Sequence, residues 1–134
     1  ALRNRMRRVR VCCGEWDRIL TPCITVGIGM TGVFLDPPYA DTAKRDPSLY
    51  THDCGQVAHA VREWAIANGN GKRWRIVLCG YEGEHEMPGD WECVQWKAQG
   101  GYANLADDDE SAGKMNRKRE RIWFSPHCEK VTLF

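Results

Sequence analysis

The chain has 134 residues, enough for one domain with a hydrophobic core, so we expect a single domain over residues 1–134. Hydrophobic residues make up 43% and charged residues 28% of the sequence, which is typical of a globular protein and excludes a disordered one. The formal net charge of +1 singles out no class of partner. No apolar run approaches the roughly 18 residues of a membrane span and no signal peptide is visible, which together predict a cytoplasmic protein.

The cysteines and histidines predict neither disulfides nor a metal site. The seven cysteines are odd in number and include no CxxC spacing, so we expect reduced, mostly buried thiols. The nearest approach to a ligand cluster is His52, Cys54 and His59, with His127 and Cys128 as a separate pair. Neither group has the spacing of a zinc site, and no metal is predicted.

Two segments concentrate positive charge. Residues 3–10, RNRMRRVR, hold five arginines, and the acidic run at residues 107–110 is followed by a basic run at residues 114–121. Segments of this kind can hold phosphate groups. They are equally common as solvated faces or disordered loops, and the sequence leaves both interpretations open.

The N-terminal quarter of the chain is predicted to hold one strand. Residues 9–13, VRVCC, are short and β-rich and end at Gly14. Residues 15–22 allow one turn of helix before a proline, and residues 23–31 form a glycine-punctuated loop with some extended character.

Residues 32–80 give the clearest pattern. Residues 32–36 predict a second strand, and the three prolines within residues 37–52 predict a loop. Residues 53–68 predict a helix, and residues 74–80 predict a third strand. The order of strand, loop, helix and strand is that of a βαβ unit, in which the two strands are parallel.

The predicted helix carries its own boundary signals and an apolar face. Asp53 and Gln56 fit a capping box, and Gly69 supplies the stop. Helical spacing places five apolar residues on one face, namely Val57, Ala58, Val61, Trp64 and Ala65.

The last part of the chain adds two strands, at residues 91–96 and 121–125, separated by a polar segment of the length that is usually functional or disordered. The predicted fold class is therefore α/β, in three layers, with mainly parallel strands and a terminal antiparallel hairpin.

The second strand ends in an unusual way, in Asp36, Pro37, Pro38 and Tyr39. Proline cannot donate to a strand ladder, so the plain interpretation is a strand followed by a rigid turn. However, ligands of parallel sheets bind beyond the carboxyl ends of the strands, which favours a site here. Asp36 and the carbonyl of Pro37 would accept the two N–H bonds of an exocyclic amine, and the fixed φ of the prolines would aim that carbonyl. Tyr39 would stack on a base that has left the duplex.

These residues also carry a family resemblance. LDPPY at residues 35–39, with VRVCCGEWDRIL before it and RERIWFSPHC after it, resembles the DNA adenine-N6 methyltransferases of the Dam-like D12 class, especially phage and prophage versions. The resemblance covers about residues 8–128. It implies a three-layer Rossmann-like methyltransferase fold, S-adenosylmethionine as cofactor, double-stranded DNA as partner, and a bacterial or phage-infected cell as the setting.

The resemblance assigns roles residue by residue. Asp36, Pro37, Pro38 and Tyr39 match the catalytic motif, in which Asp36 borders the cofactor as well as the target base. No residue is assigned as a general base, and Asp36 need only accept hydrogen bonds.

Glu15 and Trp16 match the acidic–aromatic pair that lies over the adenine of the donor, although a turn carboxylate is the plain alternative for Glu15. Tyr102 lies in the loop near the target base, as a second stacking group or as a solvated tyrosine. The candidate DNA contacts in the basic run are Lys114, Arg117 and Arg119.

The chain departs from the family in its donor site. Members carry a Phe-x-Gly-x-Gly turn after their first strand and an acid on their second, and neither is present. Residues 27–32, GIGMTG, precede a strand instead of following one. In the family's sheet order, 3-2-1-4-5-7-6, residues 9–13 would be strand 3 and residues 32–36 strand 4. Without strands 1 and 2, strand 4 would expose an unpaired apolar edge.

Three functions fit these observations. The first is a fragment or split half of a DNA adenine-N6 methyltransferase, with a further chain supplying the missing strands, or a homodimer covering the edge. The second is a non-catalytic, phage-derived binding protein on a methylase remnant, gripping DNA or a host defence protein. The third, ranked last because the donor site is missing, is a complete small methyltransferase acting on a free base or a protein amide.

Overall fold

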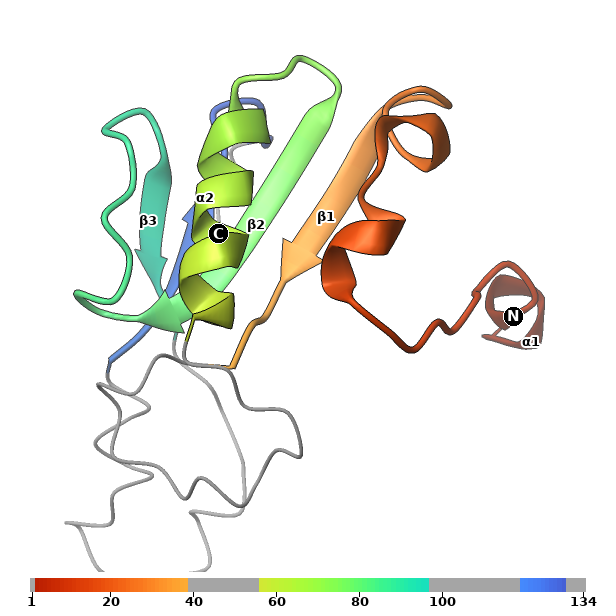
Figure 1. Cartoon of the computed structure of the whole chain (residues 1–134), viewed down its shortest axis with the longest axis horizontal. Helices are drawn as coiled ribbons and strands as arrows, with labels where there is room; N and C mark the ends of the chain where they lie inside the picture. Colours follow the sequence, from red (N-terminus) through yellow and green to blue (C-terminus); the bar gives the residue numbers. More distant parts are fainter. Residues whose placement is uncertain (1, 39–55, 97–118, 130–134) are drawn as a thin grey trace, which may run out of the picture.

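The computed structural model describes residues 2–38, 56–96 and 119–129 (Figure 1). Its elements in chain order are helix α1 (Leu2–Met6), the 3-10 turns η1 (Trp16–Ile19) and η2 (Pro22–Ile24), strand β1 (Thr31–Leu35), helix α2 (Val57–Gly69) and strands β2 (Trp74–Tyr81), β3 (Glu92–Gln95) and β4 (Glu120–Phe124).

The strands form one mixed sheet in the order β1-β2-β4-β3. β1 and β2 are parallel, in register from Thr31 opposite Trp74 to Leu35 opposite Leu78. β4 is antiparallel to both β2 and β3. The fold class is therefore α/β, and the predicted pairing of parallel strands on either side of a helix is confirmed.

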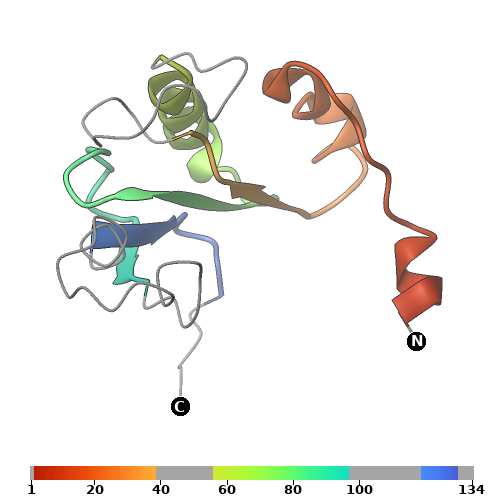
Figure 2. The same cartoon turned by 90° about the horizontal axis from the view of Figure 1, so that it is seen from below.

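The strand directions agree with the prediction of mainly parallel strands and an antiparallel terminal hairpin. β1, β2 and β3 run in one direction, and the last strand, β4, runs opposite to them. One feature of the predicted architecture differs. Among the described residues, the helix packed on the sheet, α2, covers one face, so the expected third layer is not seen there (Figure 2).

The core lies between α2 and the face of β2 that it covers. Ile76 and Leu78 of β2 are completely buried, and their neighbours from the helix include Val61 and Ala65. Val57 and Trp64 are half-buried against the same cluster. The predicted apolar face of the helix is thus confirmed.

The C-terminal end of α2 is explained by side-chain packing, whereas no side-chain capping hydrogen bond is found among the described residues at its N-terminal end. Asp53 lies outside the described residues, and Gln56, which precedes α2, makes no side-chain capping hydrogen bond. Gly69 is the last helical residue, and a Cβ there would lie 2.5 Å from the ring of Trp91. Close packing against Trp91 therefore requires glycine at this position.

The strand predicted at residues 9–13 is wrong. These residues belong to no helix or strand, and every residue from 2 to 15 is exposed. Val11 retains 94% of its accessible surface. β-branched residues favour strands because they pack on a pleated, half-buried surface, and here no neighbouring strand provides one. Because this segment does not pack, Cys12 and Cys13 are exposed, as are Cys23 and Cys93, so the described thiols are not mostly buried.

β1 has an open edge, as predicted. Among the described strands it pairs with β2 alone. Exposed large apolar side chains concentrate in this part of the chain, since all those found among the described residues, apart from Trp96, lie within residues 2–34.

Candidate functional site

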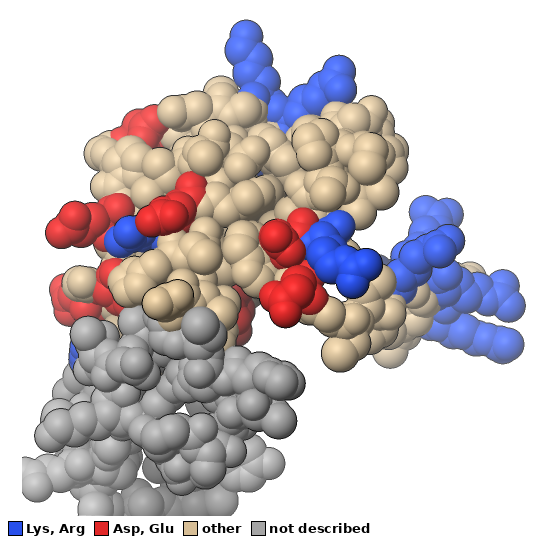
Figure 3. All heavy atoms as spheres, in the orientation of Figure 1, with Lys and Arg blue, Asp and Glu red and all other residues tan. Residues whose placement is uncertain are grey.

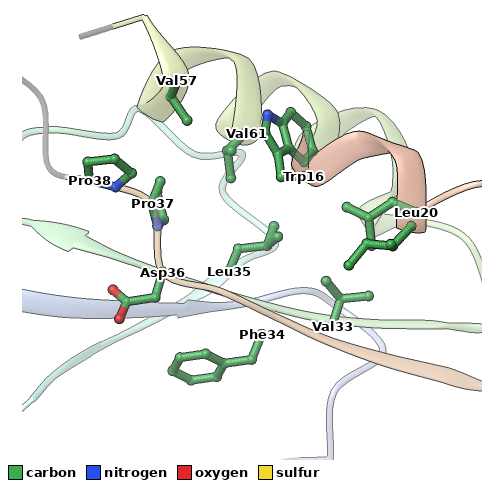
Figure 4. Close-up of a pocket in the computed structure, with 11 residues that line it drawn as sticks. Trp16, Leu20, Val33, Phe34, Leu35, Asp36, Pro37, Pro38, Val57 and Val61 are labelled. Carbon is green, nitrogen blue, oxygen red and sulfur yellow. The ribbon is translucent and has the colours of Figure 1, made fainter. Parts of the chain in front are cut away.

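The three described residues of the DPPY motif lie directly beyond the carboxyl end of β1 (Figure 4). Asp36 is exposed, Pro37 is buried and Pro38 is half-buried. Tyr39, the fourth residue, lies outside the described residues. The buried prolines fix the backbone direction, and the carboxylate is left accessible to a ligand.

A pocket of about 300 Å³ opens beside this motif. Its walls come from β1, from η1 and from the first turns of α2, with Trp16 and Leu20 on one side and Val57 and Val61 on another. Asp36 is the one charged side chain among the described residues that line it. An apolar hollow with a single carboxylate in its lining is typical of a small-molecule binding site.

Trp16 is held in the pocket wall by other tryptophans. Its ring packs edge-on against Trp64 of α2, with centroids 6.2 Å apart, and Trp64 packs edge-on against Trp74 of β2 at 5.3 Å. The sequence placed Trp16 after a strand that does not form. Its position beside Asp36 comes from this aromatic stack instead, and the structure brings the two candidate residues into one pocket.

Trp16 also borders a second hollow, of about 320 Å³, with Ile19 as the other shared residue. Glu15, Arg18 and the two adjacent thiols of Cys12 and Cys13 belong to its lining. Glu15 is exposed, and its side chain makes no capping hydrogen bond to η1, so its carboxylate is available to accept hydrogen bonds from a ligand.

The residues fit S-adenosylmethionine in part. Trp16 offers a flat apolar surface for a nucleobase, and Glu15, in the second hollow that Trp16 also lines, offers an acceptor for ribose hydroxyls. Gly27, in the glycine-rich run of residues 27–32, closes a tight backbone turn and is not part of a cofactor site. Its N–H donates to the Pro22 carbonyl at 2.7 Å, and a Cβ would lie 2.6 Å from that oxygen. No cradle for the amino-acid end of the donor is found among the described residues.

The carboxyl end of β2 contributes two groups that the sequence did not single out. Burial, followed by the negative charges of Asp36 and Glu120, raises the pKa of Cys79 to about 11. The thiol of Cys79 is therefore protonated at neutral pH and is a poor nucleophile. Cys79 could have been singled out from the sequence, because it lies at the end of a predicted strand. No sequence pattern predicts the burial of the second group, His85.

His85 is 6% exposed and lies edge-on to Trp123, with ring centroids 5.2 Å apart. Its Nε2 lies 3.4 Å from the Cys79 carbonyl, which can only accept, so Nε2 carries the proton. Nδ1 is buried and has no hydrogen-bond partner among the described residues. Burial lowers the pKa of His85, because a second proton on Nδ1 would be a buried donor without an acceptor.

The predicted DNA contacts are only partly described. Lys114, Arg117 and Tyr102 lie outside the described residues, whereas the guanidinium of Arg119 lies 5.1 Å from the centre of the Tyr81 ring. The arginines of residues 3–10, by contrast, are all exposed and form a cluster that projects from the body (Figure 3).

Neither a metal centre nor a membrane span is found in the part of the chain that the structure describes. No group of three or more His, Cys, Asp or Glu side chains there is arranged to hold an ion. None of its helices combines the length and the apolar character needed to cross a bilayer.

Comparison of the chain with protein-family models, with curated proteins and with solved structures found no match. A function must therefore be inferred from the residues that line the two hollows.

Proposed function

We propose that this chain is the catalytic-motif portion of a DNA adenine-N6 methyltransferase of the Dam-like class, which transfers a methyl group from S-adenosylmethionine to a flipped adenine. The observation that carries the proposal is the pocket that Asp36, Pro37 and Trp16 line together. The two motifs of the resemblance are separated by about twenty residues of chain and meet at one hollow. The strand order β1-β2-β4-β3 supports the same proposal, because it corresponds to 4-5-7-6 in the family's sheet order when β1 is counted as strand 4.

The proposed chemistry depends on two hydrogen-bond acceptors. The exocyclic amine of adenine is a weak nucleophile, because its lone pair is delocalised into the ring. Asp36 accepts one N–H bond and the carbonyl of Pro37 accepts the other, which favours a tetrahedral nitrogen with a localised lone pair. Burial of Pro37 holds that carbonyl in a fixed direction. The donor, when bound, would supply the methyl group as an electrophile and would leave as the neutral thioether S-adenosylhomocysteine, since its S–CH3 bond breaks as the N–CH3 bond forms. The amine nitrogen would then lose one proton to solvent.

The donor site is incomplete in this chain, which is why the proposal is a portion of an enzyme. Glu15 and Trp16 would hold the nucleoside end, whereas the amino-acid end has no cradle among the described residues. The open edge of β1 is where further strands would join the sheet. Those strands would come from a longer chain or from a partner chain.

The first test is calorimetric titration with S-adenosylmethionine. We expect no binding by the chain alone, and micromolar binding once the N-terminal half of a D12-class enzyme is supplied. Transfer of labelled methyl groups to an adenine-containing duplex should appear in the same reconstituted sample. A reconstituted sample that binds the donor and still methylates no adenine-containing duplex would exclude the proposed reaction.

Two carboxylate variants sharpen this test. Asp36→Ala should abolish methyl transfer while leaving the fold intact, because Asp36 is exposed. Asp17→Ala is the matched control, since Asp17 is an exposed carboxylate of η1 that lines neither hollow. Equal transfer by both variants would remove Asp36 from the mechanism.

A second candidate function, a non-catalytic nucleic-acid or protein binder, is favoured by the exposed arginines of residues 3–10. Binding through these arginines would weaken steeply as salt rises, because each phosphate contact releases counterions. Fluorescence anisotropy with a labelled duplex at several salt concentrations tests it. Unchanged affinity after replacement of these arginines by glutamine would contradict this function.

A further inference from the structure

The open edge of β1 has a defined hydrogen-bonding pattern. The N–H of Thr31 donates to the Arg73 carbonyl at 2.8 Å, so this residue faces β2. Backbone groups alternate in direction along a strand, and those of Val33 and Leu35 therefore also face β2. The N–H and C=O groups of Gly32 and Phe34 face the open edge, where no described strand pairs with them.

Side chains on this edge are complementary to one another. Phe34 is 66% exposed and points away from the face that carries α2, opposite to Val33 and Leu35 (Figure 4). Gly32 lies two residues earlier, on the same face as Phe34, and nothing lies within 4 Å of the position that a Cβ would take there. One strand thus carries both an exposed ring and an empty place next to it.

We propose that two copies of this chain pair through their β1 strands, antiparallel and with the two-fold axis at Val33. In this register Gly32 lies opposite the partner's Phe34, and Phe34 lies opposite the partner's Gly32. Both pairs have edge-facing backbone groups and exchange N–H···O=C bonds, as antiparallel geometry requires. Each phenyl ring covers the glycine of the other copy, an arrangement that protects glycine in strands. The proposal does not rest on the proposed function, and it concerns the chain without the further strands that would occupy the same edge.

The open edge carries exposed apolar side chains that a second copy can cover. An aromatic side chain presents about 150–250 Å², so Phe34 alone leaves roughly 100 Å² or more uncovered in each copy. Met30 and Ile28, which directly precede β1, are 71% and 79% exposed. Exposed apolar side chains on and directly before β1 are typical of an interaction site.

The charges permit this pairing as well. β1 and Met30 carry no charged side chain, so two copies meet without like charges opposite one another. The arginine-rich α1 projects on the side of β1, toward its carboxyl end, in Figure 1. Antiparallel pairing places the carboxyl ends of the two β1 strands at opposite ends of the seam, which separates the two clusters. Because residues 2–15 are exposed, no packed contact of theirs must be displaced.

Sedimentation equilibrium of the full chain under reducing conditions tests the proposal. We expect a monomer–dimer equilibrium, and Phe34→Glu should raise its dissociation constant at least about tenfold. Trp96→Glu is the matched control, since Trp96 is an exposed aromatic residue next to β3, and it should leave the constant unchanged.

A double variant tests the register itself. In Gly32→Lys/Phe34→Glu, each lysine faces the partner's glutamate, so dimerisation should recover about threefold or more relative to Phe34→Glu. Hydrogen exchange of the unaltered chain provides a measurement that needs no variant. The amides of Gly32 and Phe34 should gain protection as concentration rises, while that of Val33, which faces β2, should not change.

Three outcomes would overturn the proposal. They are a chain that is monomeric at every concentration, an equal response of the Phe34 and Trp96 variants, and a double variant that dimerises no better than Phe34→Glu. If the chain stays monomeric and instead binds the N-terminal half of a D12-class enzyme through Phe34, the edge belongs to that half and the second copy is excluded.

Discussion

The two parts of this molecule on either side of residues 39–55 are built differently. From residue 56 onward, α2 and the central strands β2 and β4 enclose a core in which Ile76 and Leu78 are inaccessible to solvent. In residues 2–38, most side chains are exposed, and the contacts with the core come from a few residues of η1 and β1. The stable part thus lies in one region, and the candidate catalytic and cofactor residues lie in the other.

This difference indicates how the site is supported. Trp16 and Asp36 are held at the margin of a core to which they contribute little, so changes to them should affect a ligand more than the fold. An exposed apolar margin also costs solubility unless something covers it. The region that carries the candidate site is therefore also the region for which we propose a partner.

Replacing a core residue should give the largest difference between the two regions. Leu78→Ala removes a completely buried side chain and should lower the free energy of unfolding by about 2–5 kcal/mol. Val11→Ala, in the exposed segment, should change it by less than about 0.5 kcal/mol. Urea unfolding measures both, and similar losses would mean that residues 2–15 are packed after all.

Trp64 joins the two regions, because its ring contacts both Trp16 and Trp74. Trp64 is half-buried, so Trp64→Ala should cost about 2–3 kcal/mol, below the roughly 3–5 kcal/mol of a fully buried aromatic. It should also release η1, and limited trypsin digestion would then show faster cleavage after Arg18. An unchanged cleavage rate would show that Trp16 is held by other contacts.

Two glycines distinguish the regions on a smaller scale. Gly69→Ala places a methyl group 2.5 Å from the Trp91 ring and should cost about 1–3 kcal/mol through overpacking. Gly32→Ala meets open space and should alter the unfolding free energy by less than about 0.5 kcal/mol in the monomer. The thermal unfolding midpoint of each variant at low concentration decides between these expectations.

The elements that were predicted well are those with strong local patterns. The helix at residues 53–68 and the strands at residues 32–36 and 74–80 combine periodic apolar residues with clear breakers, and each appears within a few residues of its expected bounds. The strand at residues 9–13 failed because β-propensity requires a neighbouring strand, which the sequence of a single segment does not reveal.

The candidate site was predictable in part. Asp36 and Pro37 were found because a parallel strand places its ligand site at its carboxyl end. The meeting of Trp16 with Asp36 depends on Trp64, on a separate helix, and no local pattern encodes that contact. The burial of His85 was missed for the same reason, since it depends on Trp123 and on the absence of a side chain at Gly80.

His85 predicts a pH dependence of stability that arises in the packed region. Its pKa is lowered by burial, to which the charges of Arg62 and His59 add, against an opposing contribution from Glu84. The unfolded chain, with an ordinary histidine pKa near 6.5, therefore binds this proton more readily than the folded one. The stabilisation is complete above that value and is lost as the pH falls toward the lower pKa of the folded state.

The free energy of unfolding should accordingly decline below about pH 6.5, by at most about 1.4 kcal/mol per pH unit for this one proton. His85→Gln should remove that decline, because glutamine does not titrate. His127→Gln is the control and should retain it, since His127 bonds to the Asn70 carbonyl at the surface. Urea unfolding between about pH 5 and pH 8 measures all three proteins. If the free energy of unfolding of His85→Gln still declined in full below about pH 6.5, another group would be the one that titrates. The pH dependence would then not arise from the buried Nδ1 of His85, which has no hydrogen-bond partner among the described residues.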